Sequence, residues 1–290
     1  IDETHLIDKE KIDLLFCRGY ANLQTGNTVK ALEIFKTLKV MESRYQPTAR
    51  YYTGYCEYVL GNYEAALPDL LAVETHPEFE DVAPYYITQI YYSLKNYSEV
   101  DKRADFLLKK YPDSKYNAEL YRINGERSYA TGNYIKAIEN LKNYEKISPT
   151  VMRNDMYYLG ISYVKTNQSQ QAIQYLSKVT TQNDEMSENA YLQLGNAYIN
   201  SGDKNNARMA FEAATRTNFN NFVREEALYN YALTTYETTT AFGESVKAFE
   251  QFIAEFPNSK HADQAYDYLS TVYLTSKNYR AAYESVSKIK

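Results

Sequence analysis

The side chains that could do chemistry in this chain are sparse and far apart in the sequence. The three histidines are His5, His76 and His261. A zinc site needs His or Cys ligands paired at short spacing, or carboxylates on one helix face, and the sequence shows no such pattern. We therefore interpret the histidines as surface or helix-capping residues, and we expect neither a metal nor a cofactor.

The two cysteines, Cys17 and Cys56, are expected to be free. They fall in two predicted helices at different helical phases, whereas a disulfide needs Cα atoms within about 7 Å and side chains that face each other. We interpret both as buried thiols. Such thiols fit a reducing compartment and do not exclude the periplasm.

Acidic pairs are the remaining candidates for catalysis, namely Asp184-Glu185 and Glu225-Glu226. Each pair lies where a helix is predicted to begin, and carboxylates there complement the positive end of the helix dipole. The sequence contains no glycine-rich phosphate loop, no nucleophile elbow and no metalloprotease helix. We therefore expect a protein that is not an enzyme.

The helices that must position any functional side chain can be predicted from a pattern of three residues that recurs eight times at regular spacing. We call each set of three a triple. In each triple a small residue, or its substitute, precedes a turn residue by seven positions, and a small apolar residue follows five positions later. The triples are Gly19, Gly26, Ala31; Gly54, Gly61, Ala66; Thr88, Lys95, Val100; Gly125, Gly132, Ala137; Gly160, Asn167, Ala172; Gly195, Gly202, Ala207; Ala232, Gly243, Ala248 with four extra loop residues; and Ser270, Lys277, Ala282. Their first members lie 35, 34, 37, 35, 35, 37 and 38 residues apart, which predicts a stacked repeat array.

Each repeat is predicted to form two antiparallel helices. In residues 188–224 an apolar stripe ends at the turn Ser201-Gly202-Asp203, and a second stripe follows it. Gly195 and Ala207 are predicted to face each other where the two helices come closest. The recurring turn residues suit a positive φ angle or cap the next helix. Prolines then end the second helices, at Pro77, Pro112, Pro149 and Pro257.

These motifs resemble the tetratricopeptide repeat, whose signature is W-x2-L-G-x2-Y, then A-x3-F, then P. Leu194-Gly195-x2-Tyr198 with Ala207-x3-Phe211 carries the resemblance most directly. It implies an all-α fold, a right-handed superhelical solenoid of about eight repeats. The expected repeats are 12–46, 47–80, 81–117, 118–152, 153–187, 188–224, 225–262 and 263–290, after a segment 1–11 that ends a preceding helix or forms an N-terminal extension.

Two segments that connect successive repeats resemble those of a particular group of tetratricopeptide proteins. Tyr111-Pro112-Asp113-Ser114-Lys115 and Phe256-Pro257-Asn258-Ser259-Lys260 each close one repeat and begin the next. Such links are similar in style to those of bacterial envelope tetratricopeptide proteins, such as the barrel-assembly lipoprotein and the Tol–Pal coordinator. The resemblance implies a bacterial protein, with the periplasm or cell envelope favoured over the cytoplasm and an envelope-associated complex as a possible setting.

Composition limits the partners. The 32 basic and 37 acidic residues give a net charge of −5, whereas nucleic-acid binding favours a basic face. No apolar run approaches the roughly 18 residues of a membrane helix. The chain begins at Ile1 and ends at Lys290 within the second helix of the last repeat, with no evident polar cap. We therefore expect a processed or trimmed sequence that belongs to a longer protein.

The resemblance also implies which residues line a candidate binding groove, because repeat positions 5, 9 and 12 line the concave side of the array in this family. The candidate groove residues are Tyr20, Tyr51, Tyr55, Tyr58, Tyr85, Gln89, Tyr92, Arg122 and Glu126. Two interpretations of the tyrosines remain open: a ligand-facing aromatic surface, or packing between helices. The carboxylate clamp of chaperone-binding arrays is absent, because no repeat has Lys at position 5.

Three functions are compatible with these patterns. The first is a non-catalytic scaffold that binds a peptide or a partner segment in its concave groove. The second is a module that binds carbohydrate or peptidoglycan through tyrosine faces. The third is a structural arm of a longer enzyme or sensor. The lengthened loop at Thr238–Gly243 is interpreted as a tolerated insertion, with a docking role for Phe242 as the alternative.

Overall fold

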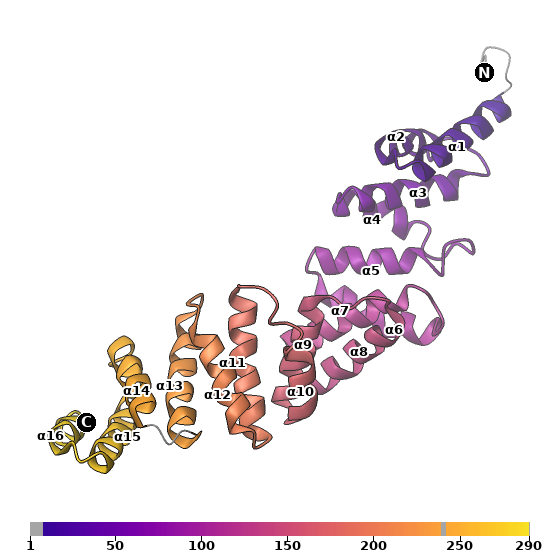
Figure 1. Cartoon of the computed structure of the whole chain (residues 1–290). Coiled ribbons are helices and arrows are strands. Elements are labelled where there is room, and N and C mark those ends of the chain that lie inside the picture. Colours follow the sequence, from indigo (N-terminus) through magenta and orange to yellow (C-terminus); the bar gives the residue numbers. More distant parts are fainter. Residues whose placement is uncertain (1–7, 239–241, 290) are drawn as a thin grey trace. The chain divides into compact units, whose positions relative to one another are not determined.

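The fold consists of helical pairs. The computed structural model describes residues 8–238 and 242–289, and all sixteen regular elements in this part of the chain are α-helices (Figure 1). Successive helices form eight hairpins. The predicted all-α architecture of about eight repeats is therefore confirmed.

The chain divides into two compact units, Ile1–Asn124 and Gly125–Lys290. The first unit contains α1 (Asp8–Gln24), α2 (Thr28–Leu38), α3 (Gln46–Val59), α4 (Tyr63–Leu71), α5 (Ala83–Ser93), α6 (Tyr97–Lys110) and the start of α7 (Asn117–Ala130). The second unit contains the end of α7, then α8 (Tyr134–Ile147), α9 (Arg153–Lys165), α10 (Ser169–Leu176), α11 (Glu185–Asn200), α12 (Lys204–Thr215), α13 (Asn221–Thr238), α14 (Phe242–Glu255), α15 (Ala262–Thr275) and α16 (Tyr279–Val286).

Two predicted segments fall partly outside the described residues. Residues 1–7, including His5, lie outside them, and α1 begins at Asp8, so residues 8–11 run directly into the first helix of the first hairpin. The side chain of Phe242 and residues 239–241 also lie outside. Gly243 was predicted as a turn residue, but it lies in the first turn of α14. The turn position that the triple predicts for this hairpin is therefore wrong.

The hairpin turns have the backbone geometry that their residues predict. Gly26, Gly61, Gly132 and Gly202 have φ angles of 77–83°, and Lys95, Asn167 and Lys277 have φ angles of 58–61°. At the first turn the N–H of Asn27 donates to the carbonyl of Asn22, and that of Gly26 donates to Leu23. This pair of bonds is the Schellman motif, which satisfies the last carbonyls of the first helix.

The glycine that begins five of the triples permits close contact with a residue sixteen positions later. A Cβ atom on Gly54, Gly125 or Gly160 would lie 2.5–2.6 Å from Leu70, Leu141 or Leu176. At Gly195 the obstructing group is the ring of Phe211. The side chain that crowds Gly195 most closely is thus that of Phe211, one helical turn after the predicted partner Ala207.

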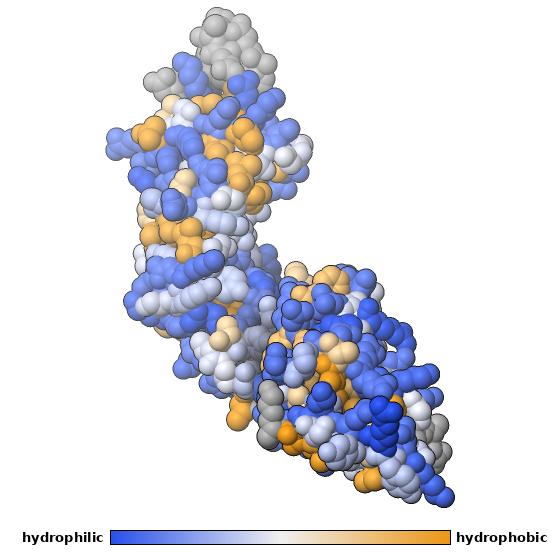
Figure 2. All heavy atoms as spheres, turned by 90° about the vertical axis from the view of Figure 1, so that its left-hand side faces the viewer, coloured by the Kyte–Doolittle hydropathy of each residue, from blue (hydrophilic) through white to orange (hydrophobic). Residues whose placement is uncertain are grey.

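The core lies between helices within each unit. Buried clusters include Phe35 and Leu38 in the first hairpin, and Phe249 and Phe252 in the seventh. Cys56 is buried as predicted, but Cys17 is exposed, and both thiols are free. On the face that Figure 2 shows, exposed hydrophobic residues form separate small groups among hydrophilic ones.

The described helices were also compared with the requirements of a membrane span and of a metal site. None of them is both long and apolar enough to cross a membrane. Within residues 8–238 and 242–289, no group of three or more His, Cys, Asp and Glu side chains is placed to hold a metal ion.

Candidate functional site

The candidate groove residues of the first unit lie on four first helices, α1, α3, α5 and α7. On α3, Tyr51, Tyr55 and Tyr58 are spaced by four and three residues, which places them on one helix face. The rings of Tyr51 and Tyr55 stack with centroids 6.3 Å apart. The repeat register therefore brings these three side chains together as predicted.

Tyr85 does not belong to the exposed part of this site. Its side chain is 0% exposed, and its hydroxyl donates to Oδ1 of Asn117 at 3.1 Å. The amide of Asn117 in turn donates to the carbonyls of Tyr111 and Pro112. Tyr85 therefore stabilises the link between α6 and α7, and its predicted place in the groove is corrected to a place in the core.

Tyr51 is also mostly enclosed. It is 9% exposed, and its ring stacks on Phe79 with centroids 4.4 Å apart and planes 9° apart. This burial raises the pKa of the Tyr51 hydroxyl well above its usual value, with a smaller contribution from Tyr116. Tyr51 thus supports the surface from beneath.

The ring at the centre of the site is Tyr86, which the groove positions missed. Its centroid lies 5.3 Å from that of Tyr55 and 5.1 Å from that of Tyr58. Burial raises its pKa, so the hydroxyl stays protonated near neutral pH. No sequence signal distinguished it, because neighbouring residues of a helix do not alternate between a buried and an exposed face, and Ala83, Pro84 and Tyr85 are all buried.

A polar edge borders these rings. The Tyr58 hydroxyl donates to Oε1 of Gln89, which lies one hairpin further along. Arg122 donates to Glu119 from Nε at 2.9 Å and from Nη2 at 2.5 Å, and its Cζ lies 6.0 Å from the ring centroid of Tyr92. Burial is the main cause of the raised pKa of Tyr58, followed by the nearby charge of Glu119. The edge therefore combines an ion pair with neutral donors.

The aromatic contacts continue to the first hairpin through Tyr52. Tyr20 is 41% exposed, and its centroid lies 5.9 Å from that of Tyr52 in an edge-to-face arrangement. Tyr52 in turn lies 5.2 Å from Tyr51. We call the set that spans the first three hairpins the tyrosine surface: Tyr20, Tyr52, Tyr55, Tyr58, Tyr86 and Tyr92, with Gln89 at its edge.

One predicted residue falls in the other compact unit. Glu126 is in α7 but belongs to the second unit, whereas the other candidates belong to the first. Within the first unit, the structure brings together most of the predicted residues and replaces Tyr85 with Tyr86. Half-buried aromatic faces beside protonated hydroxyls suit the recognition of a ligand more than the transfer of protons.

Family comparisons match three consecutive hairpins of the second unit. Residues 188–221 match a tetratricopeptide-repeat family model, and residues 156–184 and 226–259 match another. These segments cover most of α9 to α14. No curated protein sequence matches the chain.

Several solved structures share the fold. YrrB, a tetratricopeptide-repeat protein with an unusual peptide-binding site, has a TM-score of 0.53 at 18% identity over 72% of this chain and 97% of its own. MamA of AMB-1 has a TM-score of 0.50 at 16% identity over 61% and 91%. A tetratricopeptide-repeat protein from Parabacteroides merdae has a TM-score of 0.49 at 13% identity over 88% and 97%. At these identities the likeness concerns the fold alone.

Proposed function

This chain carries tetratricopeptide repeats, a fold that serves as a protein-interaction scaffold, and we propose that it binds an extended polypeptide segment on the tyrosine surface of its first unit. The observation that carries the proposal is the packing of Tyr55, Tyr58 and Tyr86 around one half-buried patch. Tyrosine supplies a large rigid contact area and loses little conformational entropy on binding.

The chemistry of this surface favours a peptide. An extended peptide presents carbonyl groups that tyrosine hydroxyls can bond and side chains that aromatic faces can cover. Burial raises the pKa of both Tyr58 and Tyr86, so both hydroxyls stay uncharged at neutral pH. The Tyr58 hydroxyl already donates to Gln89, so Tyr58 offers a peptide its ring face and an acceptor oxygen. The peptide-binding site of YrrB supports the same class of ligand for this chain.

The test uses a library of displayed random peptides selected against the intact chain. Tyr55→Ala combined with Tyr58→Ala is expected to lower the affinity of the selected peptides by at least about tenfold, because hot-spot aromatics each contribute about 2 kcal/mol or more. Tyr283→Ala removes an exposed tyrosine from α16 of the second unit and serves as the matched control. Circular dichroism verifies that each variant is still helical.

Two results would contradict the proposal. Peptides that bind the double variant as tightly as the original chain do not use this surface. If no peptide is selected, but the chain binds glycans on an array and needs Tyr55 and Tyr58 to do so, the ligand of this surface is a carbohydrate. A role as the structural arm of a longer protein predicts neither kind of binding.

A further inference from the structure

A second exposed aromatic feature lies in the second unit, on the loop between α12 and α13. This loop comprises residues 216–220, and we call it the α12–α13 loop. Phe219 within the loop is 52% exposed, and Phe222 in the first turn of α13 is 63% exposed. Two exposed phenylalanines so close in sequence are unusual, because most such side chains are covered in a folded protein.

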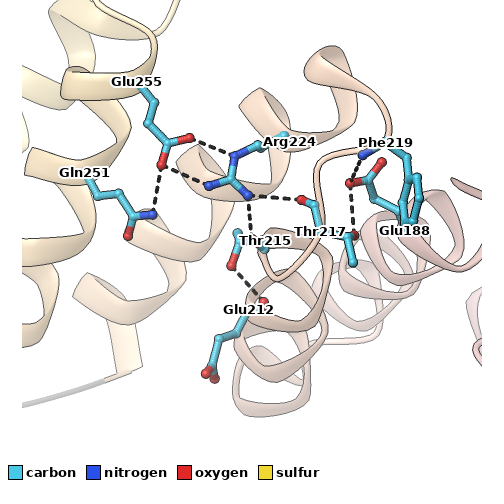
Figure 3. Close-up of polar contacts among 8 residues, drawn as sticks. All are labelled: Glu188, Glu212, Thr215, Thr217, Phe219, Arg224, Gln251 and Glu255. Atoms are coloured by element: carbon cyan, nitrogen blue, oxygen red, sulfur yellow. Dashed lines mark hydrogen bonds and ion pairs between the residues drawn. The ribbon is translucent and has the colours of Figure 1, made fainter. Parts of the chain in front are cut away.

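Buried polar groups hold the loop from its inner side. Glu188 of α11 is 1% exposed and accepts hydrogen bonds from the backbone N–H groups of Phe219 at 3.1 Å and Asn220 at 2.9 Å. It also accepts from the hydroxyl of Thr217 at 3.0 Å (Figure 3). A buried carboxylate is costly unless several donors satisfy it, and here the donors belong to the loop.

A guanidinium group holds the same loop from the other side. Nη1 of Arg224 donates to the carbonyls of Thr215 at 2.6 Å and Thr217 at 3.0 Å. Its other nitrogens donate to Glu255 of α14 at 2.7 and 3.0 Å (Figure 3). The backbone between Thr215 and Asn220 is therefore fixed between Glu188 and Arg224, and it leads directly into the first turn of α13, which bears Phe222. A segment that is already ordered loses little backbone entropy on binding.

A groove of about 450 Å³ begins beside Phe222, and we call it the α13 groove. It runs between the first turn of α13 and the link that follows α14. Its lining residues are Phe222, Glu225, Glu226, Glu255, Phe256, Pro257, Asn258, Ser259 and Lys260. Aromatic and proline side chains supply the apolar part. Of the three carboxylates, Glu226 pairs with Lys260 and Glu255 pairs with Arg224. The groove is therefore apolar and carries about one excess negative charge.

Two of the groove carboxylates, Glu226 and Glu255, keep their charge near neutral pH. Hydrogen bonds from Lys260 and His261 lower the pKa of Glu226 against the opposing effect of its burial. A hydrogen bond from Arg224 lowers the pKa of Glu255. Because Lys260 Nζ lies 2.8 Å from Glu226 and Arg224 pairs with Glu255 at 2.7 Å, the local excess of negative charge rests mainly with Glu225.

We propose that the α13 groove is a second docking surface, which binds a short peptide segment that carries Lys or Arg beside a bulky apolar side chain. The apolar side chain packs against Phe222 and Phe256, and the cationic group pairs with Glu225. Charge complementarity decides the class of partner, since the Glu225 carboxylate attracts a cationic group and repels an acidic one. This surface is separate from the tyrosine surface and does not depend on it.

The test measures synthetic twelve-residue peptides by fluorescence anisotropy against the intact chain. One set places Arg beside Leu or Phe, a second replaces Arg with Glu, and a third replaces the apolar residue with Ser. Only the first set is expected to bind, and its affinity is expected to fall as salt rises from about 0.05 to 0.5 M because exposed charges are screened.

Substitutions locate the site. Phe222→Ser and Glu225→Lys are each expected to weaken binding of the first set at least tenfold. Phe106→Ser, which changes an exposed phenylalanine of α6 in the first unit, is the matched control. Tyr55→Ala with Tyr58→Ala is also expected to leave this binding unchanged, which separates this proposal from the tyrosine surface.

Four outcomes would overturn the proposal. The first is that peptides of the Glu set bind, and the second is that the first set still binds both the Phe222→Ser and the Glu225→Lys variants. The third is that the chain forms a dimer in sedimentation which Phe222→Ser dissociates. The fourth is that the chain attaches to phosphatidylcholine vesicles and needs Phe222 to do so. The third outcome would assign the surface to a second copy of the chain, and the fourth would assign it to lipid.

Discussion

A Cβ atom on Gly54 would lie 2.6 Å from Cγ of Leu70, sixteen residues later on the facing helix. The carbonyl oxygen of Ala66 would also lie 3.0 Å away. Because Leu Cγ sits close to its own backbone and the carbonyl belongs to the backbone, neither group can move aside freely. The closest approach of α3 and α4 therefore depends on the missing side chain.

Replacement of Gly54 by Ala is expected to destabilise the first unit. Helix propensity alone would stabilise α3 by about 1 kcal/mol, but overpacking of a tight contact costs about 1–3 kcal/mol. We expect the overpacking to dominate and the free energy of unfolding to fall by up to about 2 kcal/mol. Urea denaturation monitored by circular dichroism measures the change.

Gly243→Ala is the control for this prediction. Gly243 lies in a helix, α14, but a Cβ atom there would meet no atom within 4 Å. The substitution is therefore expected to stabilise the chain by up to about 1 kcal/mol. If both substitutions stabilise, the glycines follow helix propensity and the close-approach argument is wrong.

The helical hairpins could be predicted from the sequence because they depend on local relationships. A small residue, a turn residue that accepts positive φ and a second small residue recur at fixed offsets, and both the turns and the close approaches follow from these offsets. The seventh hairpin is the exception, since its predicted turn residue, Gly243, lies in a helix.

The exposure of individual tyrosines could not be predicted in the same way. Tyr51 is covered by Phe79, which lies in the link between α4 and α5 and follows no repeat position. Tyr85 is covered by Asn117 at the start of the next hairpin. Burial at these positions depends on neighbouring hairpins and links, whereas the repeat register describes only one hairpin at a time.

Alkaline pH is expected to destabilise the array through its buried tyrosines. Burial is the main cause that raises the pKa of Tyr229 to about 12 and that of Tyr273 to about 12. In the unfolded chain a tyrosine titrates near about pH 10. Because the folded pKa is higher, the stabilisation is complete below about pH 10 and is lost as pH rises through the folded value.

Thermal unfolding at increasing pH, together with tyrosinate absorbance, checks this prediction. Tyr229→Phe is expected to reduce the loss of stability above pH 10, although it also removes the hydrogen bond from Tyr229 to Gln264. Tyr283→Phe changes an exposed side chain and is expected to leave the alkaline profile unchanged. A profile that Tyr229→Phe does not alter would contradict the assignment.

Acidic pH is expected to weaken the link between the fifth and sixth hairpins at Asp184. This residue caps α11 by accepting from the N–H of Ser187 at 2.9 Å, and it pairs with Arg153 at 2.6 and 2.7 Å. The hydrogen bond from Arg153 lowers the pKa of Asp184 far below its usual value. Its contribution is therefore present above about pH 4 and is lost as pH falls through the folded value.

Two substitutions separate the charge from the cap. Asp184→Asn retains an acceptor for the N–H of Ser187 but loses the charge, so its stability should depend less on pH below about pH 4. Asp184→Ala loses the cap as well, and its free energy of unfolding is expected to fall by about 1 kcal/mol more. Melting temperatures between neutral and acidic pH test both expectations. Equal acid sensitivity of the Asn variant and the original chain would contradict them.

The α12–α13 loop is expected to lose its order when Glu188 is removed. Glu188→Ala leaves the N–H groups of Phe219 and Asn220 and the hydroxyl of Thr217 without their buried acceptor. Unsatisfied buried donors cost about 1–3 kcal/mol each, and partial access of water should reduce the total to about 2–4 kcal/mol.

Hydrogen exchange of the backbone amides of Phe219 and Asn220 should become faster than in the original chain, while amides of α9 should keep their rates. Glu188→Gln retains one acceptor oxygen and should fall between the two, because the amide oxygen can serve only some of the three donors. If Glu188→Ala leaves exchange at Phe219 and Asn220 unchanged, the loop is held by Arg224 alone.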